Sequence, residues 1–112
     1  MKKIDAVLID DKKNIRDWWS ESGIDAGINC LTFSSVIEFL ENISTIPHET
    51  PIYVDSRLEN GVLGEIEAEK IFEEGFKTIY LASTEPPDEL PSYIIRSMGK
   101  VPPWGKDPLD DL

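Results

Sequence analysis

Four short apolar runs, each ending at polar residues, limit this chain to a small set of folds. The runs cover residues 6–9, 28–33, 51–54 and 78–82, and a weaker fifth candidate covers residues 93–95. Runs of this length, flanked by turn residues, are typical of strands buried on both faces of a sheet. We therefore expect five strands.

Amphipathic segments that predict helices separate the runs. In residues 12–22, Ile15, Trp18, Trp19 and Ser22 fall on one helical stripe, and Gly23 is a plausible helix end. The two tryptophans are expected in the core.

Two further helices are expected, at residues 35–43 and 64–74. The first opens with the capping-box spelling of Ser35 and Glu38, and the second stops at Gly75. Residues 85–91 allow a short helix at most, because Pro91 breaks a long one.

Strands that alternate with helices predict an α/β fold, with a doubly wound parallel sheet covered on both sides. Ligands of such sheets bind beyond the carboxyl ends of the strands. We expect one domain over residues 1–104, followed by a short polar tail over residues 105–112.

The composition excludes several classes of partner. The 112 residues include 22 acidic and 11 basic side chains, for a net charge of −11. A nucleic-acid or anionic membrane surface needs clustered Lys and Arg, so we expect neither partner. No apolar run is long enough for a membrane span or a signal peptide. A single cysteine, Cys30, favours a reducing cytoplasm and is expected to be buried.

Polar side chains collect at the predicted strand ends. Asp10 and Asp11 follow the first strand, and Asp55 follows the third. Ser83 and Thr84 follow the fourth strand, and Lys100 follows the fifth candidate. Crowded carboxylates favour a bound cation, and Mg²⁺ prefers oxygen ligands. The set suits phosphoryl transfer onto an aspartate.

In these residues and their order, the chain resembles the response-regulator receiver domains of two-component signalling. The resemblance covers residues 3–104 and implies a flavodoxin-like five-stranded sheet of order 2-1-3-4-5. It implies that Asp55 accepts the phosphoryl group and that Lys100 pairs with it. The metal ligands for Mg²⁺ would be Asp10, Asp11, Asp55 and the Arg57 backbone carbonyl. The switch hydroxyl would be Ser83, with Thr84 as the alternative.

The chain departs from the receiver pattern in four places. Val101 separates Lys100 from the proline that usually follows it, and residues 58–61 replace the usual Met-Pro loop. The switch aromatic expected at the end of strand five is absent. Eight residues follow Trp104, too few for a last helix of ordinary length. We expect Trp104 to fold back, at least half buried, against the first helix or the neighbouring strands.

Two functions follow. The first is a phospho-accepting receiver whose partner is a histidine kinase or a phosphotransfer protein. The alternative is a receiver-like interaction or dimerisation module that is not phosphorylated. In either case, an apolar patch left by the missing helix is expected to pair with a second copy or with a preceding kinase domain. A phosphohydrolase is a distant third, because Asp10-Asp11-Lys12 does not spell an Asp-x-Asp motif.

Each site residue also has an ordinary structural interpretation. Asp10 and Asp11 could cap a helix, and Asp55 could be a turn residue. Ser83-Thr84 could start a helix, and Lys100 could be a surface charge. All four interpretations would have to hold at one rim of the sheet.

Overall fold

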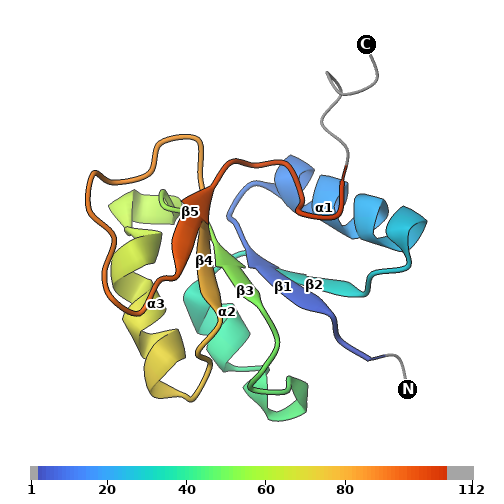
Figure 1. The fold of residues 1–112 in the computed structure, drawn as a ribbon, viewed down its shortest axis with the longest axis horizontal. Coiled ribbons are helices and arrows are strands. Elements are labelled where there is room, and N and C mark those ends of the chain that lie inside the picture. Colours follow the sequence, from blue (N-terminus) through green and yellow to red (C-terminus); the bar gives the residue numbers. More distant parts are fainter. Residues whose placement is uncertain (1–2, 106–112) are drawn as a thin grey trace.

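The computed structural model describes residues 3–105, and its centre is a five-stranded, all-parallel sheet (Figure 1). The strand order is β2-β1-β3-β4-β5. The strands are β1 (Ala6–Ile9), β2 (Cys30–Phe33), β3 (Ile52–Val54), β4 (Ile79–Ala82) and β5 (Arg96–Met98). The predicted fold class and strand order are confirmed.

Three α-helices connect the strands: α1 (Lys13–Ala26), α2 (Val36–Leu40) and α3 (Gly64–Glu73). Short 3₁₀ turns cover Ile43–Thr45 and Glu59–Gly61. The expected helix start at Ser35 is confirmed, since the Ser35 hydroxyl accepts a hydrogen bond of 3.1 Å from the Glu38 N–H. None of the helices in residues 3–105 is long and apolar enough to cross a membrane.

The first helix runs past its expected end. Gly23 lies buried inside α1, where a Cβ atom would stand 2.7 Å from the Ile28 carbonyl oxygen. Gly23 therefore lets the helix pass close to the chain that follows it. Gly27, at a φ of 74°, ends the helix in the left-handed conformation instead.

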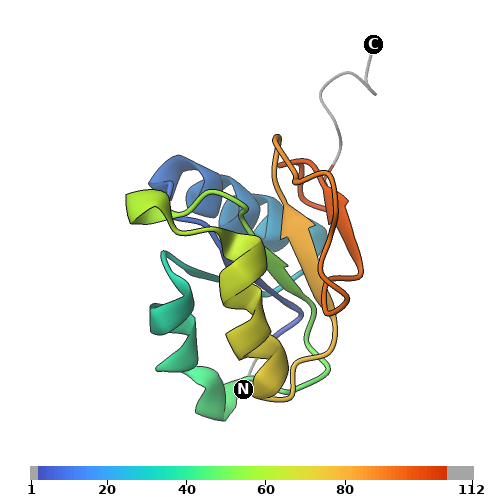
Figure 2. The same ribbon diagram turned by 90° about the vertical axis from the view of Figure 1, so that its left-hand side faces the viewer.

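Alternate strand residues face two separate apolar layers. On one face, Val7, Ile52 and Leu81 pack with side chains of α2 and α3. On the other face, Leu8, Tyr53 and Ala82 pack with Trp19 of α1. Figure 2 shows α2 and α3 side by side on their face of the sheet.

The connection from β4 to β5 differs from the prediction. Residues 83–95 contain no helix, and the fifth strand begins at Arg96 rather than at Tyr93. Ile94 closes a turn on Pro91 and is buried in the core, while the Tyr93 hydroxyl donates to the Glu65 carbonyl. Tyr93 and Ile94 therefore pack in the apolar layer that contains α2 and α3. The residues that follow them, Arg96–Met98, pair with β4.

The segment after β5 covers part of the face that a last helix would occupy. It passes toward α1 in Figure 1, and a turn joins the Gly105 N–H to the Pro102 carbonyl at 2.9 Å. Trp104 is more than half buried and packs edge-on against Trp19, with ring centroids 5.4 Å apart. This confirms the prediction for Trp104. The prediction for Trp18 is wrong: 37% of it is exposed, because the helix turns it away from the sheet. Of the polar tail expected over residues 105–112, the part after Gly105 lies outside the described residues.

Candidate functional site

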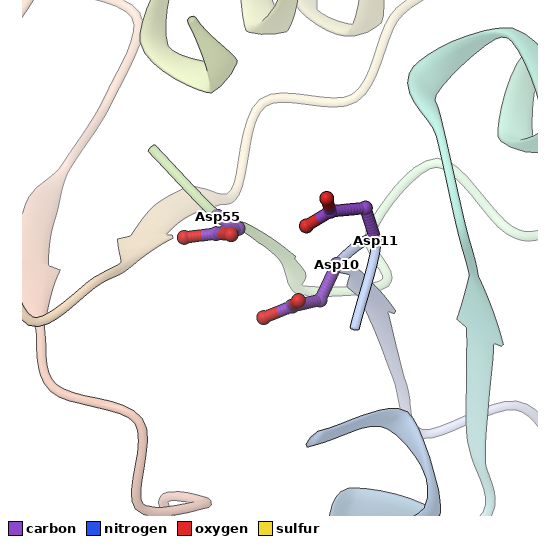
Figure 3. Close-up of side chains that lie close together, drawn as sticks. All are labelled: Asp10, Asp11 and Asp55. Atoms are coloured by element: carbon purple, nitrogen blue, oxygen red, sulfur yellow. The ribbon is translucent and has the colours of Figure 1, made fainter. Parts of the chain in front are cut away.

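Three carboxylates meet at the carboxyl edge of the sheet (Figure 3). Asp10 and Asp11 follow β1, and Asp55 follows the neighbouring strand β3. One oxygen from each side chain lies within 4.8 Å of the others. Asp10 and Asp55 are buried, with exposures of 0% and 2%, and Asp11 is partly exposed. The parallel register therefore assembles the predicted acidic cluster.

Lys100 reaches into the same site and bridges two of the carboxylates. Its Nζ lies 2.7 Å from Asp10 Oδ2 and 2.7 Å from Asp55 Oδ1. Only 16% of the Lys100 side chain is exposed. The ammonium therefore balances part of the buried negative charge, although Val101 separates Lys100 from the prolines.

Backbone contacts fix the aspartates in place. Asp10 Oδ1 accepts a hydrogen bond of 2.9 Å from the Lys12 N–H, and the Asp10 carbonyl accepts one of 2.9 Å from the Arg16 guanidinium. The Asp55 carbonyl oxygen lies against the start of α3, where a Cβ on Gly64 would stand 1.7 Å from it. No side chain larger than hydrogen fits at Gly64 without displacing Asp55.

Burial raises the pKa of the Asp55 carboxyl above its ordinary value, because desolvation disfavours the charged form. The hydrogen bond from Lys100 lowers the pKa, and the nearby charge of Asp10 raises it. Lys100 therefore helps to keep a buried carboxylate ionised.

Two buried carboxylate oxygens accept no hydrogen bond from the described residues: Asp11 Oδ1 and Asp55 Oδ2. The Lys12 ammonium approaches Asp11 Oδ1 at 3.7 Å. Unsatisfied anionic oxygens within a cluster of three carboxylates suit a hard divalent cation such as Mg²⁺. The donor set therefore fits Mg²⁺, the metal expected from the sequence.

The remaining predicted residues lie around this cluster. Within residues 3–105, no hydrogen bond reaches the Arg57 carbonyl, and the Arg57 side chain pairs with Glu85 at 2.9 Å. Ser83 is buried at the end of β4, and its hydroxyl accepts a bond of 3.1 Å from the Glu85 N–H. Thr84 is exposed. Neither hydroxyl forms a hydrogen bond with Asp55 among the described contacts, so both switch assignments stay predictions.

Sequence reasoning assigned no site role to two residues that contact this cluster. Arg16 holds the Asp10 carbonyl, and the Trp19 indole N–H donates to the Lys100 carbonyl at 2.8 Å. The helical stripe indicated only that Trp19 is in the core. No sequence pattern relates it to a residue 81 positions away.

His48 and Cys30 lie elsewhere. His48 is exposed, with its ring edge-on to Phe76 at 5.0 Å. Cys30 is buried, as expected, and burial raises the pKa of its thiol to about 12. A thiol of this kind is unreactive at neutral pH.

Comparison with known proteins identifies the fold. No family model matches the chain, and no curated protein matches its sequence. Among solved structures, the chain is similar to a CheY-like response regulator receiver domain protein from Methanospirillum hungatei JF-1. The match has a TM-score of 0.66 and 16% identity, and it covers 88% of this chain and 83% of the other. The chain therefore has the fold of a CheY-like receiver domain.

Proposed function

We propose that residues 1–104 form a phospho-accepting receiver domain of a two-component or phosphorelay system. The observation that carries the proposal is the Lys100 ammonium, 2.7 Å from both Asp10 and Asp55, beside a third carboxylate. A nucleophilic carboxylate, a cation site and a positive group are what phosphoryl transfer onto aspartate requires.

The reaction begins at Asp55. Its Oδ1 is paired with Lys100, and its Oδ2 has no hydrogen-bond partner among the described residues. In the proposal, one carboxylate oxygen of Asp55 is the nucleophile. A bond forms between this oxygen and the phosphorus of a phosphohistidine partner. The P–N bond breaks, its electron pair stays on the imidazole, and the imidazole takes up a proton. Lys100 balances the charge that arrives with the phosphoryl group.

Asp10, Asp11, Asp55 and the Arg57 carbonyl would hold Mg²⁺. The metal would neutralise charge on the phosphoryl oxygens when bound. The support in this chain is the pair of unsatisfied buried oxygens on Asp11 and Asp55.

Signal output would depend on a change near Asp55. In the proposal, phosphorylation draws Ser83 or Thr84 toward the new phosphate and biases a two-state surface. The partner would be a histidine kinase or a phosphotransfer protein in the cytoplasm. A second copy or a preceding kinase domain would bind at the sheet face on which α1 and Trp104 lie.

A second candidate is an interaction module that is not phosphorylated in practice. The observation that favours it is the loop at residues 83–95, which stands where the fold allows a helix between β4 and β5. Without that helix, a surface that usually changes on phosphorylation is altered. The crowded carboxylates weigh against this candidate, because they cost stability unless a cation uses them.

Incubation with phosphoramidate and Mg²⁺, followed by intact mass measurement, tests the proposal. Phosphoramidate carries the same P–N bond as phosphohistidine. We expect a mass gain of one phosphoryl group, lost in Asp55→Asn and retained in Asp88→Asn, which makes the same change at an exposed carboxylate. No gain in the wild type, or an equal gain in Asp55→Asn, would reject the phosphoacceptor and favour the interaction module.

A further inference from the structure

Lys100 lies on a stretch of backbone with little support of its own. It comes two residues after the end of β5 and follows Gly99, beside which a Cβ would meet nothing within 4 Å. Within residues 3–105, one hydrogen bond reaches its main chain: the Trp19 indole N–H donates to the Lys100 carbonyl at 2.8 Å. A lysine side chain has four rotatable bonds, so its backbone must be held if the ammonium is to be aimed.

Trp19 is a rigid donor. It is completely buried, and its ring lies between Tyr53 at 5.2 Å and Trp104 at 5.4 Å. Tilted and edge-on aromatic contacts of this kind hold a ring in one orientation. The direction of the indole N–H is therefore fixed, and the Lys100 carbonyl oxygen lies in that direction and accepts its hydrogen bond.

We propose that Trp19 is the positioning residue for Lys100: its indole N–H fixes the backbone that aims the ammonium at Asp10 and Asp55. The segment from Pro102 to Trp104 contributes by holding the Trp19 ring.

The ordinary alternative is that Trp19 only fills the core and its N–H bonds to the nearest carbonyl. Trp104 provides the comparison. Its Nε1 is also buried, yet it has no hydrogen-bond partner among the described residues. Two indoles in one cluster thus differ in the bond to Lys100, and this difference gives a matched control.

The first test compares Trp19→Phe with Trp104→Phe. Both changes replace a two-ring indole by a single phenyl ring and remove an indole N–H in the same cluster. Only the first change removes a hydrogen bond to Lys100. The measurement is the ¹⁵N NMR signal of the lysine ammonium groups, with the Lys100 signal identified by its loss in Lys100→Ala. We expect Trp19→Phe to shift or broaden this signal, and Trp104→Phe, which keeps an aromatic ring beside Trp19, to change it much less. An unchanged signal in Trp19→Phe, or equal changes in both variants, would overturn the proposal.

The second test is a double-mutant cycle on the rate of phosphorylation by phosphoramidate. Trp19→Phe should slow the reaction by roughly three- to tenfold, the ratio expected for one lost hydrogen bond. In the Lys100→Ala background it should slow the reaction no further, because Trp19 acts through Lys100. Equal slowing in both backgrounds would show that Trp19 acts by another route.

A third measurement covers the case in which Trp19→Phe does not fold. Lys100→Ala removes two ion pairs and keeps the main-chain carbonyl that Trp19 contacts, so the Trp19 indole N–H should stay protected from solvent exchange, as in the wild type. Loss of this protection would show that the ion pairs, and not Trp19, hold the backbone, and would overturn the proposal. Only the kinetic test rests on the proposed function. If the chain takes no phosphoryl group, that function fails by itself, and the two NMR measurements still decide the role of Trp19.

Discussion

Replacing Lys100 by methionine should strongly destabilise the folded protein in the absence of metal. The change keeps a long unbranched side chain and removes the positive charge between two buried carboxylates. Asp10 and Asp55 are almost completely inaccessible to water, so solvent cannot take over the role of the ammonium.

The size of the effect follows from the geometry. Oxygens of the two carboxylates lie within 4.8 Å of each other. Two unit charges at that separation repel by roughly 3–4 kcal/mol at an effective dielectric constant of about 20. The variant escapes this repulsion if one carboxyl binds a proton, which costs about 4 kcal/mol at pH 7 for a carboxyl of ordinary pKa. We therefore expect Lys100→Met to lower the free energy of unfolding by about 3–4 kcal/mol at pH 7, in the range known for broken buried ion pairs.

The loss should depend on pH. Without Lys100, the pKa of the carboxylate pair in the folded state rises above its unfolded value, so folding takes up a proton. The stability of the variant is then highest at acidic pH and falls as the pH rises, by up to about 1.4 kcal/mol per pH unit. In the wild type the pKa of Asp55 is also raised, chiefly by burial, but Lys100 opposes the shift. The wild type should show the same sign with a shallower slope.

Urea unfolding in EDTA, followed by tryptophan fluorescence at pH 5 and pH 7, measures these quantities. Lys12→Met is the matched control, because the Lys12 side chain is 57% exposed and its ion pair with Asp11 is long. It should change stability by less than about 1 kcal/mol. Asp10→Asn should restore much of the stability lost in Lys100→Met, because it removes one of the repelling charges. If Lys100→Met is as stable as wild type at both pH values, the electrostatic argument is wrong.

Three other outcomes are expected in unfolding experiments. Mg²⁺ at about 100 times its dissociation constant should raise the free energy of unfolding by about 2.7 kcal/mol, and Asp11→Asn should remove most of that gain; equal gains would place the metal elsewhere. Gly64→Ala should cost more than about 3 kcal/mol, because its Cβ would stand 1.7 Å from the Asp55 carbonyl oxygen, whereas Gly99→Ala should change stability by about 0.5 kcal/mol or less. Trp104→Ala should cost about 2–3 kcal/mol through lost packing on Trp19; an unchanged melting temperature would show that this side chain covers nothing of consequence.

The apolar pattern of the sequence predicted the sheet well where strands are buried on both faces. The strands β1, β3 and β4 contain only apolar residues and tyrosines, so burial on both faces of a parallel sheet suits them. The edge strand β5 gave no such signal, because Arg96–Met98 is polar and pairs on one side only. The strand predicted at residues 93–95 was wrong because Ile94 lies in a turn, from which its apolar side chain is buried in the core.

The acidic cluster could also be predicted from the sequence, since residues that directly follow neighbouring parallel strands must meet at one edge. Asp10, Asp11 and Asp55 meet there because β1 and β3 pair in parallel, with Ile9 opposite Val54. The position of Lys100 was different. Its side chain is long, its backbone follows a glycine, and nothing nearby in the sequence fixes where its ammonium points.

The sequence by itself thus determined the kind of fold and the gathering of three carboxylates, because both follow from short-range patterns of apolar and polar residues. Only the tertiary structure decided that Lys100 bridges Asp10 and Asp55 and that Trp19 holds its carbonyl. It also decided that Trp104 folds back on α1 while Trp18 faces solvent. These contacts join residues 45 to 90 positions apart, and their geometry depends on how the whole chain packs, which no local pattern specifies.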